Sequence, residues 1–340
     1  MEKKPPLAEI LPTHTPELFQ TAVGRAADLL RAGQVVALPT ETVYGLAANA
    51  LNSAAVARLF EVKGRPAHNP IIVHVASGDM ARRCVAHWPP LAENLARAFW
   101  PGPLTLVLAA ANDIPPIVTA NGPTVGVRWP SHPFIQAVIR ACDFPLAAPS
   151  ANPSNRLSPT NARHVQKHLG DKIKLIVDGG QSHVGIESTV LDLSAGPPCV
   201  LRPGMIHEQA LLAVVGELAL SAHDSSAVLK SPGLLKKHYS PRARLVLLEW
   251  SNESDLKAQT AKFKLPPAKI HVVAHTRVPS GKGFGRVSVI PHDAAAFARA
   301  IYAELDQCDE AGAELILVEA LPETTEWRAI ADRLKKAAAN

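Results

Sequence analysis

Cationic side chains that could hold an anionic ligand recur at turns along the first two thirds of the chain. Lys63 and Arg65 lie on either side of a glycine, and Arg128 and Arg202 each end a short apolar run. An arginine presents a planar fork that matches the oxygens of a phosphate or a carboxylate. These positions therefore indicate a site for phosphate or carboxylate groups. The alternative for each cation is an ordinary solvated position at the end of a helix or strand.

Hydroxyl and amide side chains form a second set, also in turns that contain proline or glycine. Thr42 lies in segment 40–46, directly after an apolar run, and Ser150, Asn152 and Ser158 lie in a proline-rich stretch. Such groups can orient a polar ligand. The alternative for segment 40–46 is a strand-to-helix turn in which the hydroxyls satisfy backbone groups.

Histidine and cysteine give no sign of a metal site. The fourteen histidines show no metal-ligand spacing, and the four cysteines are widely separated with no CxxC pair. His74 alternates with Ile and Val in an apolar run, so a satisfied core histidine is the alternative to a ligand-binding role there. We therefore predict no protein-held metal ion, no zinc site and no disulfide framework.

The common nucleotide and hydrolase motifs are absent from the sequence. It contains no GxxxxGK[ST], no GxGxxG, no HExxH and no GxSxG. The stretch 281–286 approaches a glycine-rich phosphate loop but lacks a strand before it and a helix after it, so a surface loop is expected there. Any nucleotide site must therefore be built in another way.

Composition bounds the class of protein. The chain has 340 residues, of which 47% are hydrophobic and 19% charged, with a net charge of +5, so a folded chain with a substantial core is expected. It lacks the long apolar run of a membrane helix and a secretory signal. With the dispersed cysteines, this favours a cytoplasmic protein that does not bind membranes.

Strands and helices alternate over residues 10–216, which predicts an α/β sheet with flanking helices. Segment 53–63 shows helical spacing of Val56, Leu59 and Phe60, with Ser53 as the expected N-cap. The other predicted helices are 16–32, 91–99, 133–142, 161–169 and 208–215. The predicted strands are 35–38, 70–75, 104–108, 124–127, 146–148, 175–177, 189–193 and 200–202.

A change of pattern marks a second, smaller domain. Segment 217–242 is rich in Ser, Pro and Gly and has no clear periodicity, so we expect a linker there. Strand and helix patterns resume in 243–340, which predicts a small Rossmann-like α/β domain. Its predicted strands are 245–249, 270–274, 286–290 and 315–318, and its predicted helices are 253–262, 294–305 and 327–336.

Seven segments together resemble one family. They are PTETVYGLAANA (39–50), KGRPAHNPIIVHV (63–75), WPGPLTLVL (100–108), TVGVRWPSHP (124–133), APSANPSNRLSPT (148–160), STVLDL (188–193) and LRPGMI (201–206). Their order is similar to that of the YrdC-like threonylcarbamoyl-AMP synthases. The linker motif SPGLLKKHYSP (231–241) is similar to that of the long, two-domain form of this family.

The resemblance implies a twisted mixed sheet with flanking helices and a reaction. In that reaction, L-threonine, bicarbonate and ATP give threonylcarbamoyl-AMP and pyrophosphate for the threonylcarbamoyladenosine modification of tRNA, which makes the chain a nucleotidyltransferase. Magnesium would enter with ATP, since an ion that bridges phosphates needs few protein ligands. The product would pass to a downstream threonylcarbamoyl transferase, and contact with tRNA would be indirect or weak.

The resemblance also implies roles for individual residues. Lys63 and Arg65 would act electrostatically, without a covalent nucleophile. The residues expected to bind L-threonine are Thr42, His74, Arg128, Ala148 and Ser188. Those expected to bind ATP are Arg65, Asn69, Thr124, Ser150, Asn152, Ser158, Arg202, His238 and Tyr239, the last two on a linker that would close over the site as a lid.

Two other functions compete with this one. An RNA-binding or translation-associated module would use a basic concave surface, but aromatic residues make up only 5% of the chain and the positive charge is dilute. A carbamoyl-transfer module of the kind fused to hydrogenase-maturation proteins would bring acylphosphatase and zinc-finger segments, which this sequence lacks. The synthase is therefore the expected function.

Overall fold

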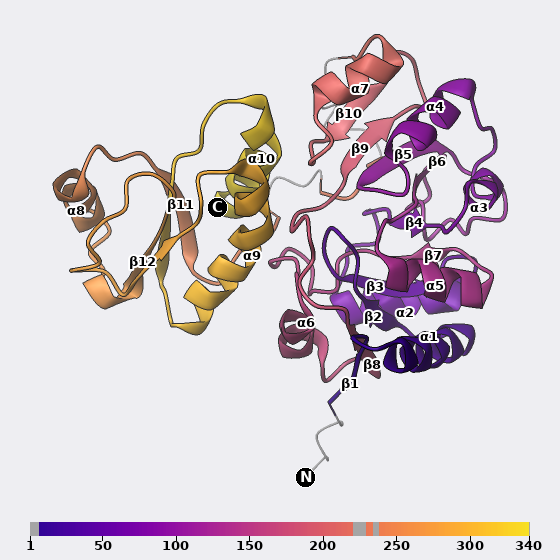
Figure 1. Cartoon of the computed structure of the whole chain (residues 1–340), viewed down its shortest axis with the longest axis horizontal. Coiled ribbons are helices and arrows are strands. Elements are labelled where there is room, and N and C mark those ends of the chain that lie inside the picture. The colour runs from indigo at the N-terminus through magenta and orange to yellow at the C-terminus, as the bar shows by residue number, and fades with distance from the viewer. Residues whose placement is uncertain (1–6, 220–228, 234–237, 340) are drawn as a thin grey trace. The chain divides into compact units, whose positions relative to one another are not determined.

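The computed structural model describes residues 7–219, 229–233 and 238–339. The chain divides into two compact units, each with its own sheet (Figure 1). The first comprises Met1–Ser154 and Ser158–Leu234, and the second comprises Asn155–Leu157 and Leu235–Asn340.

A mixed sheet of ten strands forms the centre of the first unit. Its order is β1-β8-β2-β3-β7-β4-β6-β5-β9-β10, with both parallel and antiparallel neighbours. The strands are β1 (Glu9–Pro12), β2 (Val36–Leu38), β3 (Gly45–Asn49), β4 (Ile72–His74), β5 (Leu104–Ala109), β6 (Thr124–Arg128), β7 (Leu146–Ala147), β8 (Leu175–Asp178), β9 (Thr189–Asp192) and β10 (Cys199–Arg202). The predicted mixed α/β sheet is confirmed.

Helices cover this sheet and complete one continuous apolar core. They are α1 (Pro16–Arg31), α2 (Ser53–Lys63), α3 (Gly78–Arg83), α4 (Pro90–Phe99), α5 (Pro133–Cys142), α6 (Ala162–Leu169) and α7 (Glu208–Val215). Helices α1 and α5 pack side by side (Figure 1) through an edge-to-face contact of Phe19 and Phe134, whose centroids are 5.1 Å apart.

Local capping determines where α2 begins and ends, and thereby where the predicted cations lie. The side chain of Asn52 accepts the amides of Ala54 and Ala55, so Asn52 is the N-cap and the prediction of Ser53 was wrong by one residue. At the other end Gly64 adopts φ +59°, a conformation that glycine enters without steric cost. The chain therefore turns sharply between Lys63 and Arg65.

Segment 40–46 is a strand-to-strand turn, so the alternative of a strand-to-helix turn was wrong. Strands β2 and β3 pair antiparallel on either side of it. The Thr40 hydroxyl donates to the Val43 carbonyl at 2.6 Å and accepts the Thr42 amide at 3.2 Å. This internal bonding holds Glu41 and Thr42 in fixed positions beside the sheet.

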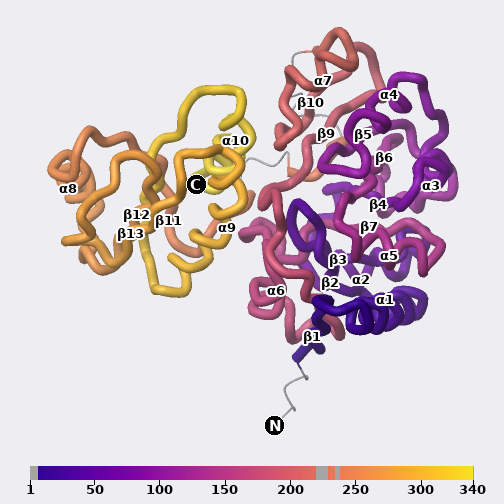
Figure 2. Tube along the Cα trace, in the orientation of Figure 1, coloured from indigo at the N-terminus to yellow at the C-terminus, as the bar shows by residue number. Residues whose placement is uncertain are grey.

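The second unit contains a parallel sheet with the order β11-β14-β12-β13. Its strands are β11 (Arg244–Leu248), β12 (Ile270–Ala274), β13 (Arg286–Val289) and β14 (Leu315–Glu319). Its helices are α8 (Glu253–Ala261), α9 (Ala294–Glu310) and α10 (Arg328–Ala338); Figure 2 traces α9 and α10 beside these strands. The expected smaller α/β domain is confirmed.

The Glu319 carboxylate organises the loop after β12. It accepts the backbone amides of His275, Thr276 and Arg277, at 2.7 Å, 2.9 Å and 3.1 Å. The Thr276 hydroxyl donates to the same carboxylate. An internal carboxylate therefore occupies the group of consecutive amides at the carboxyl end of this sheet.

The predicted linker 217–242 lies only partly within the described residues, since 220–228 and 234–237 are outside them. Two contacts within the first unit hold segment 229–233. Lys230 forms an ion pair with Asp192 at 2.9 Å, and Arg202 donates to the carbonyl of Pro232 at 3.2 Å. Among residues 7–219, 229–233 and 238–339, no helix has both the length and the apolar character needed to span a membrane.

Candidate active site

Neighbouring strands place His74 and Arg128, two of the predicted ligand-binding residues, side by side at the end of the first sheet's parallel pair. Strands β4 and β6 are parallel, with Ile72 opposite Gly126 and His74 opposite Arg128. Because side chains alternate along a strand, Thr124, Gly126 and Arg128 point to the same face. The strand ends thus bring an imidazole and a guanidinium side by side.

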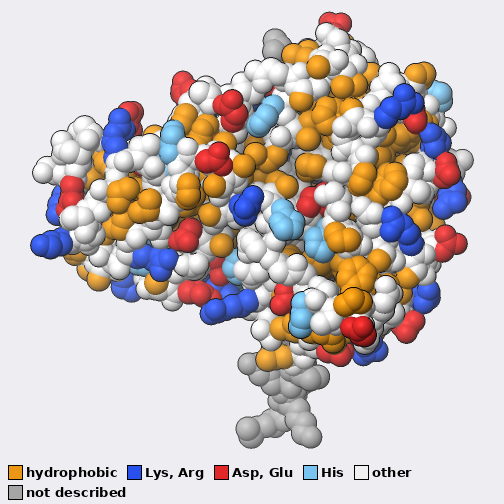
Figure 3. Space-filling model, in the orientation of Figure 1, with side chains coloured by type: hydrophobic (Ala, Val, Ile, Leu, Met, Phe, Trp, Pro, Cys, Tyr) orange, Lys and Arg blue, Asp and Glu red, His pale blue; other side chains and the backbone are white. Residues whose placement is uncertain are grey.

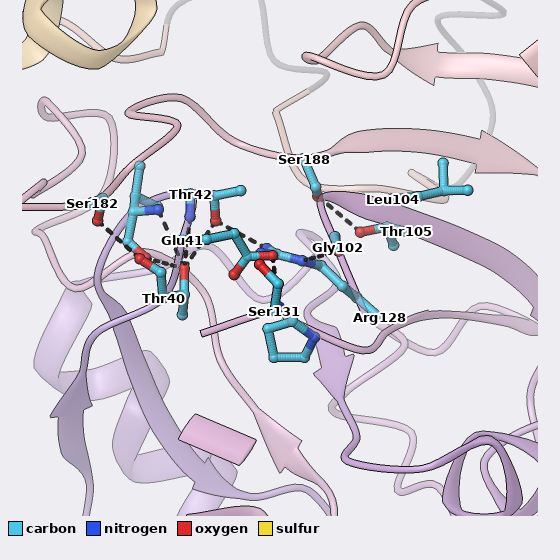
Figure 4. Close-up of polar contacts among 12 residues, drawn as sticks. Thr40, Glu41, Thr42, Gly102, Leu104, Thr105, Arg128, Ser131, Ser182 and Ser188 are labelled. Carbon is cyan, nitrogen blue, oxygen red and sulfur yellow. Dashed lines mark hydrogen bonds and ion pairs between the residues drawn. The ribbon is translucent and has the colours of Figure 1, made fainter. Parts of the chain in front are cut away.

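Arg128 is the centre of a buried polar cluster. Its Nη2 lies 2.6 Å from Oε1 of Glu41, its Nη1 donates to the Thr42 hydroxyl at 3.0 Å, and its Nε donates to the Gly102 carbonyl at 3.3 Å. Oε1 of Glu41 also accepts the Ser131 amide at 3.0 Å. Figure 4 shows the Glu41 carboxylate facing the Arg128 guanidinium.

Glu41 remains ionised in this cluster. Burial opposes its ionisation, but the charge of Arg128 and the Ser131 amide outweigh that penalty, and the pKa of the carboxyl lies below its ordinary value. The cluster therefore contains one anion and one cation.

His74 contributes a neutral group. Burial, reinforced by the charge of Arg128, lowers the pKa of its imidazole to about 3. Its Nδ1 is buried and has no hydrogen-bond partner among the described residues. His74 can therefore offer a hydrogen bond to a polar ligand without adding charge.

A second group surrounds the Ser188 hydroxyl. This hydroxyl lies 2.8 Å from the Thr105 hydroxyl and accepts a hydrogen bond from Nη2 of Arg202 at 3.1 Å. Nε of Arg202 also donates to the carbonyl of Ser188, at 3.0 Å. The contact of Ser188 with Thr105 appears in Figure 4. The structure thus joins Ser188, predicted to bind threonine, to Arg202, predicted to bind ATP.

Lys63 connects α2 to the loop that follows β7. Its ammonium donates to the carbonyl of Ser150 at 2.5 Å and to that of Asn152, and the Ser154 amide donates to the Lys63 carbonyl at 2.9 Å. Burial, with a smaller contribution from the charge of Arg65, holds the pKa of Lys63 well below its usual range. Lys63 therefore fixes the position of the Ser150–Asn152 loop.

Arg65 supports the turn before β4 in a similar way. Its Nε donates to the carbonyl of Asn69 at 3.0 Å and its Nη2 to that of Pro70 at 2.6 Å. Asn69 is buried, and its Oδ1 has no hydrogen-bond partner in the described part of the chain. Arg65 and Asn69, both predicted to bind ATP, are thus held together in one turn.

The remaining predicted residues lie at other points of the two units. Ser158 donates to Glu187 at 2.5 Å, and the backbone amide of Ala148 donates to Ile72 at 3.2 Å. Thr124 begins β6, at the end opposite to Arg128. His238 and Tyr239 belong to the second unit. There the rings of Tyr239 and Tyr302 stack with their centroids 6.0 Å apart.

The structure thus brings the predicted residues into three groups: Thr42 with His74 and Arg128, Ser188 with Arg202, and Lys63 with Arg65, Asn69, Ser150 and Asn152. Glu41, Thr105 and Glu187 each contact a predicted residue but were not themselves predicted. Ser131, also not predicted, joins the first group through its amide, which donates to Glu41. Glu41 was detectable as an acid between two threonines after an apolar run, although its partner Arg128 lies far along the chain.

On the face seen in Figure 3, lysine and arginine side chains are interspersed with aspartate and glutamate. Within the described ranges no group of three or more His, Cys, Asp or Glu side chains could hold a metal ion.

Two family models cover most of the chain. One, for Sua5, YciO and YrdC proteins and described as "Telomere recombination", matches residues 28–204. The other, described as "Threonylcarbamoyl-AMP synthase, C-terminal domain", matches residues 206–339. The threonylcarbamoyl-AMP synthase of Pyrococcus abyssi is 39% identical over 318 residues, covering 92% of each chain. The chain belongs to the threonylcarbamoyl-AMP synthase family.

Further relatives agree with this membership. The threonylcarbamoyl-AMP synthase of Bacillus subtilis is 39% identical over 338 residues, which cover 96% of this chain and 94% of the relative. The crystal structure of P. abyssi Sua5 complexed with L-threonine matches with a TM-score of 0.89 at 37% identity, over 98% of this chain and 97% of that one. The resemblance to the threonylcarbamoyl-AMP synthases is confirmed, and the chain is an enzyme of this family.

Proposed function

We propose that this chain makes threonylcarbamoyl-AMP and pyrophosphate from L-threonine, bicarbonate and ATP, for the threonylcarbamoyladenosine modification of tRNA. The observation that carries the proposal is the buried cluster around Arg128, in which a guanidinium, the Thr42 hydroxyl and a neutral imidazole converge. Such a cluster suits the carboxylate and polar groups of an amino acid. A relative at 37% identity was crystallised with L-threonine.

The proposed chemistry is the transfer of a nucleotidyl group to a carbamate. The amino group of threonine joins the carbon of bicarbonate and water leaves. A carbamate oxygen then attacks the α-phosphorus of ATP, and pyrophosphate departs. Neither step requires a covalent nucleophile from the protein, so positioning and charge neutralisation are the main contributions of the residues.

Each group has a part in this scheme. Arg128, Thr42, His74 and Ser188 would bind threonine. Arg202 would neutralise phosphate charge, and its contact with Ser188 would align the two substrates. Lys63 and Arg65 would hold the loops that carry Ser150, Asn152 and Asn69 against the nucleotide. This arrangement is an electrostatic template.

Magnesium would accompany ATP. Its ligands would be mainly phosphate oxygens and water, since Mg²⁺ keeps several waters and needs few protein ligands. The ion would neutralise charge on the departing pyrophosphate. We further propose that the labile product passes to a downstream threonylcarbamoyl transferase, with tRNA contacted indirectly or weakly.

Pyrophosphate release tests the proposal. The full chain is incubated with ATP and Mg²⁺, and release is measured with and without L-threonine and bicarbonate, while mass spectrometry follows threonylcarbamoyl-AMP. We expect release only when both are present. Release that is independent of threonine, or no release with all substrates, would refute the synthase. Tight tRNA binding together with no release would favour the RNA-binding alternative.

A further inference from the structure

One carboxylate oxygen of Glu41 is buried without a hydrogen-bond partner in the described part of the chain. The residue is 4% exposed. Its Oε1 accepts the Ser131 amide and contacts Arg128, whereas its Oε2 is buried and has no hydrogen-bond partner among the described residues. A buried carboxylate oxygen gains considerable stability from a donor, because the charge is otherwise poorly solvated. Oε2 is therefore suited to accept a hydrogen bond from a substrate.

The groups around Glu41 determine which donor fits. Arg128 balances the charge of Glu41, and His74 is neutral. If Arg128 also accepts a substrate carboxylate, two anions share one buried cation. That arrangement is unfavourable unless a second cation joins it. A hydroxyl group would not correct the imbalance, whereas an ammonium group would.

We propose that Oε2 of Glu41 receives the α-ammonium group of L-threonine while Arg128 holds the α-carboxylate. This inference rests on the proposed function and adds a substrate-binding residue to it. The ammonium and the carboxylate of an amino acid are attached to the same carbon, so a side chain paired with Arg128 lies at a suitable distance to receive the ammonium. The internal ion pair thereby becomes a four-charge arrangement with no net charge.

The same contact gives Glu41 an effect on the next step. When the ammonium reacts with bicarbonate, a carbamate anion, water and a proton form, and the proton passes to bulk water. The cationic ammonium that Glu41 attracts is thereby replaced by a neutral nitrogen that carries an anionic carboxylate, which Glu41 repels. Glu41 therefore retains free threonine and disfavours the carbamate at the same position, which directs the carbamate towards the cations that would hold ATP.

Direct binding measurements test this role. Isothermal titration calorimetry compares L-threonine with 3-hydroxybutyrate, which lacks only the amino group. The unmodified chain is expected to prefer threonine at least about 100-fold, as for a buried charged pair. In Glu41→Gln we expect this preference to fall below about 10-fold. In the pyrophosphate-release assay, the same variant should have a raised KM for threonine and an unchanged KM for ATP.

Two results would overturn the inference. One is a Glu41→Gln chain that binds threonine as the unmodified chain does. The other is an equal loss of affinity for both ligands, which would mean that Glu41 acts only by supporting Arg128. If the unmodified chain binds no threonine, the proposed function fails first, and the inference fails with it.

Control variants separate binding from folding. Glu41→Asp keeps the charge but shortens the reach, so it should recover part of the preference for threonine. Glu319→Gln removes a buried carboxylate of the second unit, and its ratio of threonine to 3-hydroxybutyrate affinity should equal that of the unmodified chain. If Glu41→Gln unfolds, the Glu41→Asp variant provides the test. A ratio of threonine to 3-hydroxybutyrate affinity equal to that of the unmodified chain, with both affinities unchanged, would contradict the inference.

Discussion

Arg128 and Glu41 form a buried ion pair in which Nη2 and Oε1 are 2.6 Å apart and each side chain is less than a tenth exposed. Arg128 ends strand β6 and Glu41 lies in the turn after β2, so the pair joins two distant segments of the chain. Each charge depends on the other, because neither has access to bulk water.

We expect Arg128→Met to destabilise the chain by about 3–5 kcal/mol, since it leaves the Glu41 carboxylate buried without a cation. Urea unfolding measures the loss. The double variant Arg128→Met/Glu41→Gln should recover part of it, because the uncompensated charge is gone. A purely additive double variant would show that the two side chains do not stabilise each other.

His74 should make stability depend on pH. Its pKa is about 3 in the folded chain and near 6.5 when unfolded, so the unfolded state binds more protons between these values and stability falls as the pH decreases below 6.5. The contribution of His74 to this fall is about 1–2 kcal/mol between pH 6.5 and pH 5. His74→Gln should remove it from urea unfolding curves measured at the two pH values; an unchanged slope would contradict the buried neutral imidazole.

Arg65 should matter for both turnover and local structure. Arg65→Ala removes hydrogen bonds to the carbonyls of Asn69 and Pro70, so we expect pyrophosphate release to be abolished and stability to fall by about 1–3 kcal/mol. Arg58→Ala, at an exposed arginine on helix α2, which ends just before Arg65, is the control and should retain activity. An unfolded Arg65→Ala chain would instead indicate that Arg65 is mainly structural.

Two glycines should respond in opposite directions to alanine. A Cβ at Gly204 would lie 2.7 Å from the Ser188 carbonyl carbon, so Gly204→Ala should cost about 3 kcal/mol and disturb the Ser188–Arg202 group. Gly24, inside α1, has nothing within 4 Å of its Cβ position, and Gly24→Ala should stabilise by about 0.5–1 kcal/mol. Thermal unfolding and threonine binding of both variants check this contrast; a harmless Gly204→Ala would refute it.

Periodicity predicted the bounds of several elements, although α9 was predicted to end at 305 and extends to Glu310. Helices α2, α5 and α7 have the predicted bounds, and β12 does also. Each of the three helices combines apolar positions with a capping residue, glycine or proline at an end, so local and global preferences agree.

The elements that were missed give weak local signals. Strand β3 (Gly45–Asn49) lies between β2 and β7, and its first four residues, three of them Gly or Ala, are all buried, so it shows no alternation. Helix α3 (Gly78–Arg83) has only six residues, and β1 has four. Such short segments take their structure from tertiary contacts rather than from their own pattern.

The site residues were predictable where their types matched a motif. They were missed where the contacts depend on which strands are neighbours in the sheet. Arg128 and Thr42 were predicted, whereas the acid between them was not, because the contact of Glu41 with Arg128 depends on strand order. Likewise, Lys63 looked like a free phosphate-binding cation in the sequence, but its ammonium is bonded to two backbone carbonyls. Residue types can suggest a ligand, but only the fold reveals which groups partner one another.

The order of strands in the first sheet has a consequence for biosynthesis. Among the strands of the described residues, β1 pairs with β8 alone, and β8 ends at Asp178. The first strand to leave the ribosome must therefore wait until more than half of the chain has been synthesised before it can pair. During that interval the apolar side of α1 lacks part of its final packing. The N-terminal segment of this enzyme should therefore depend on chaperones, or on slow translation, more than its C-terminal unit does.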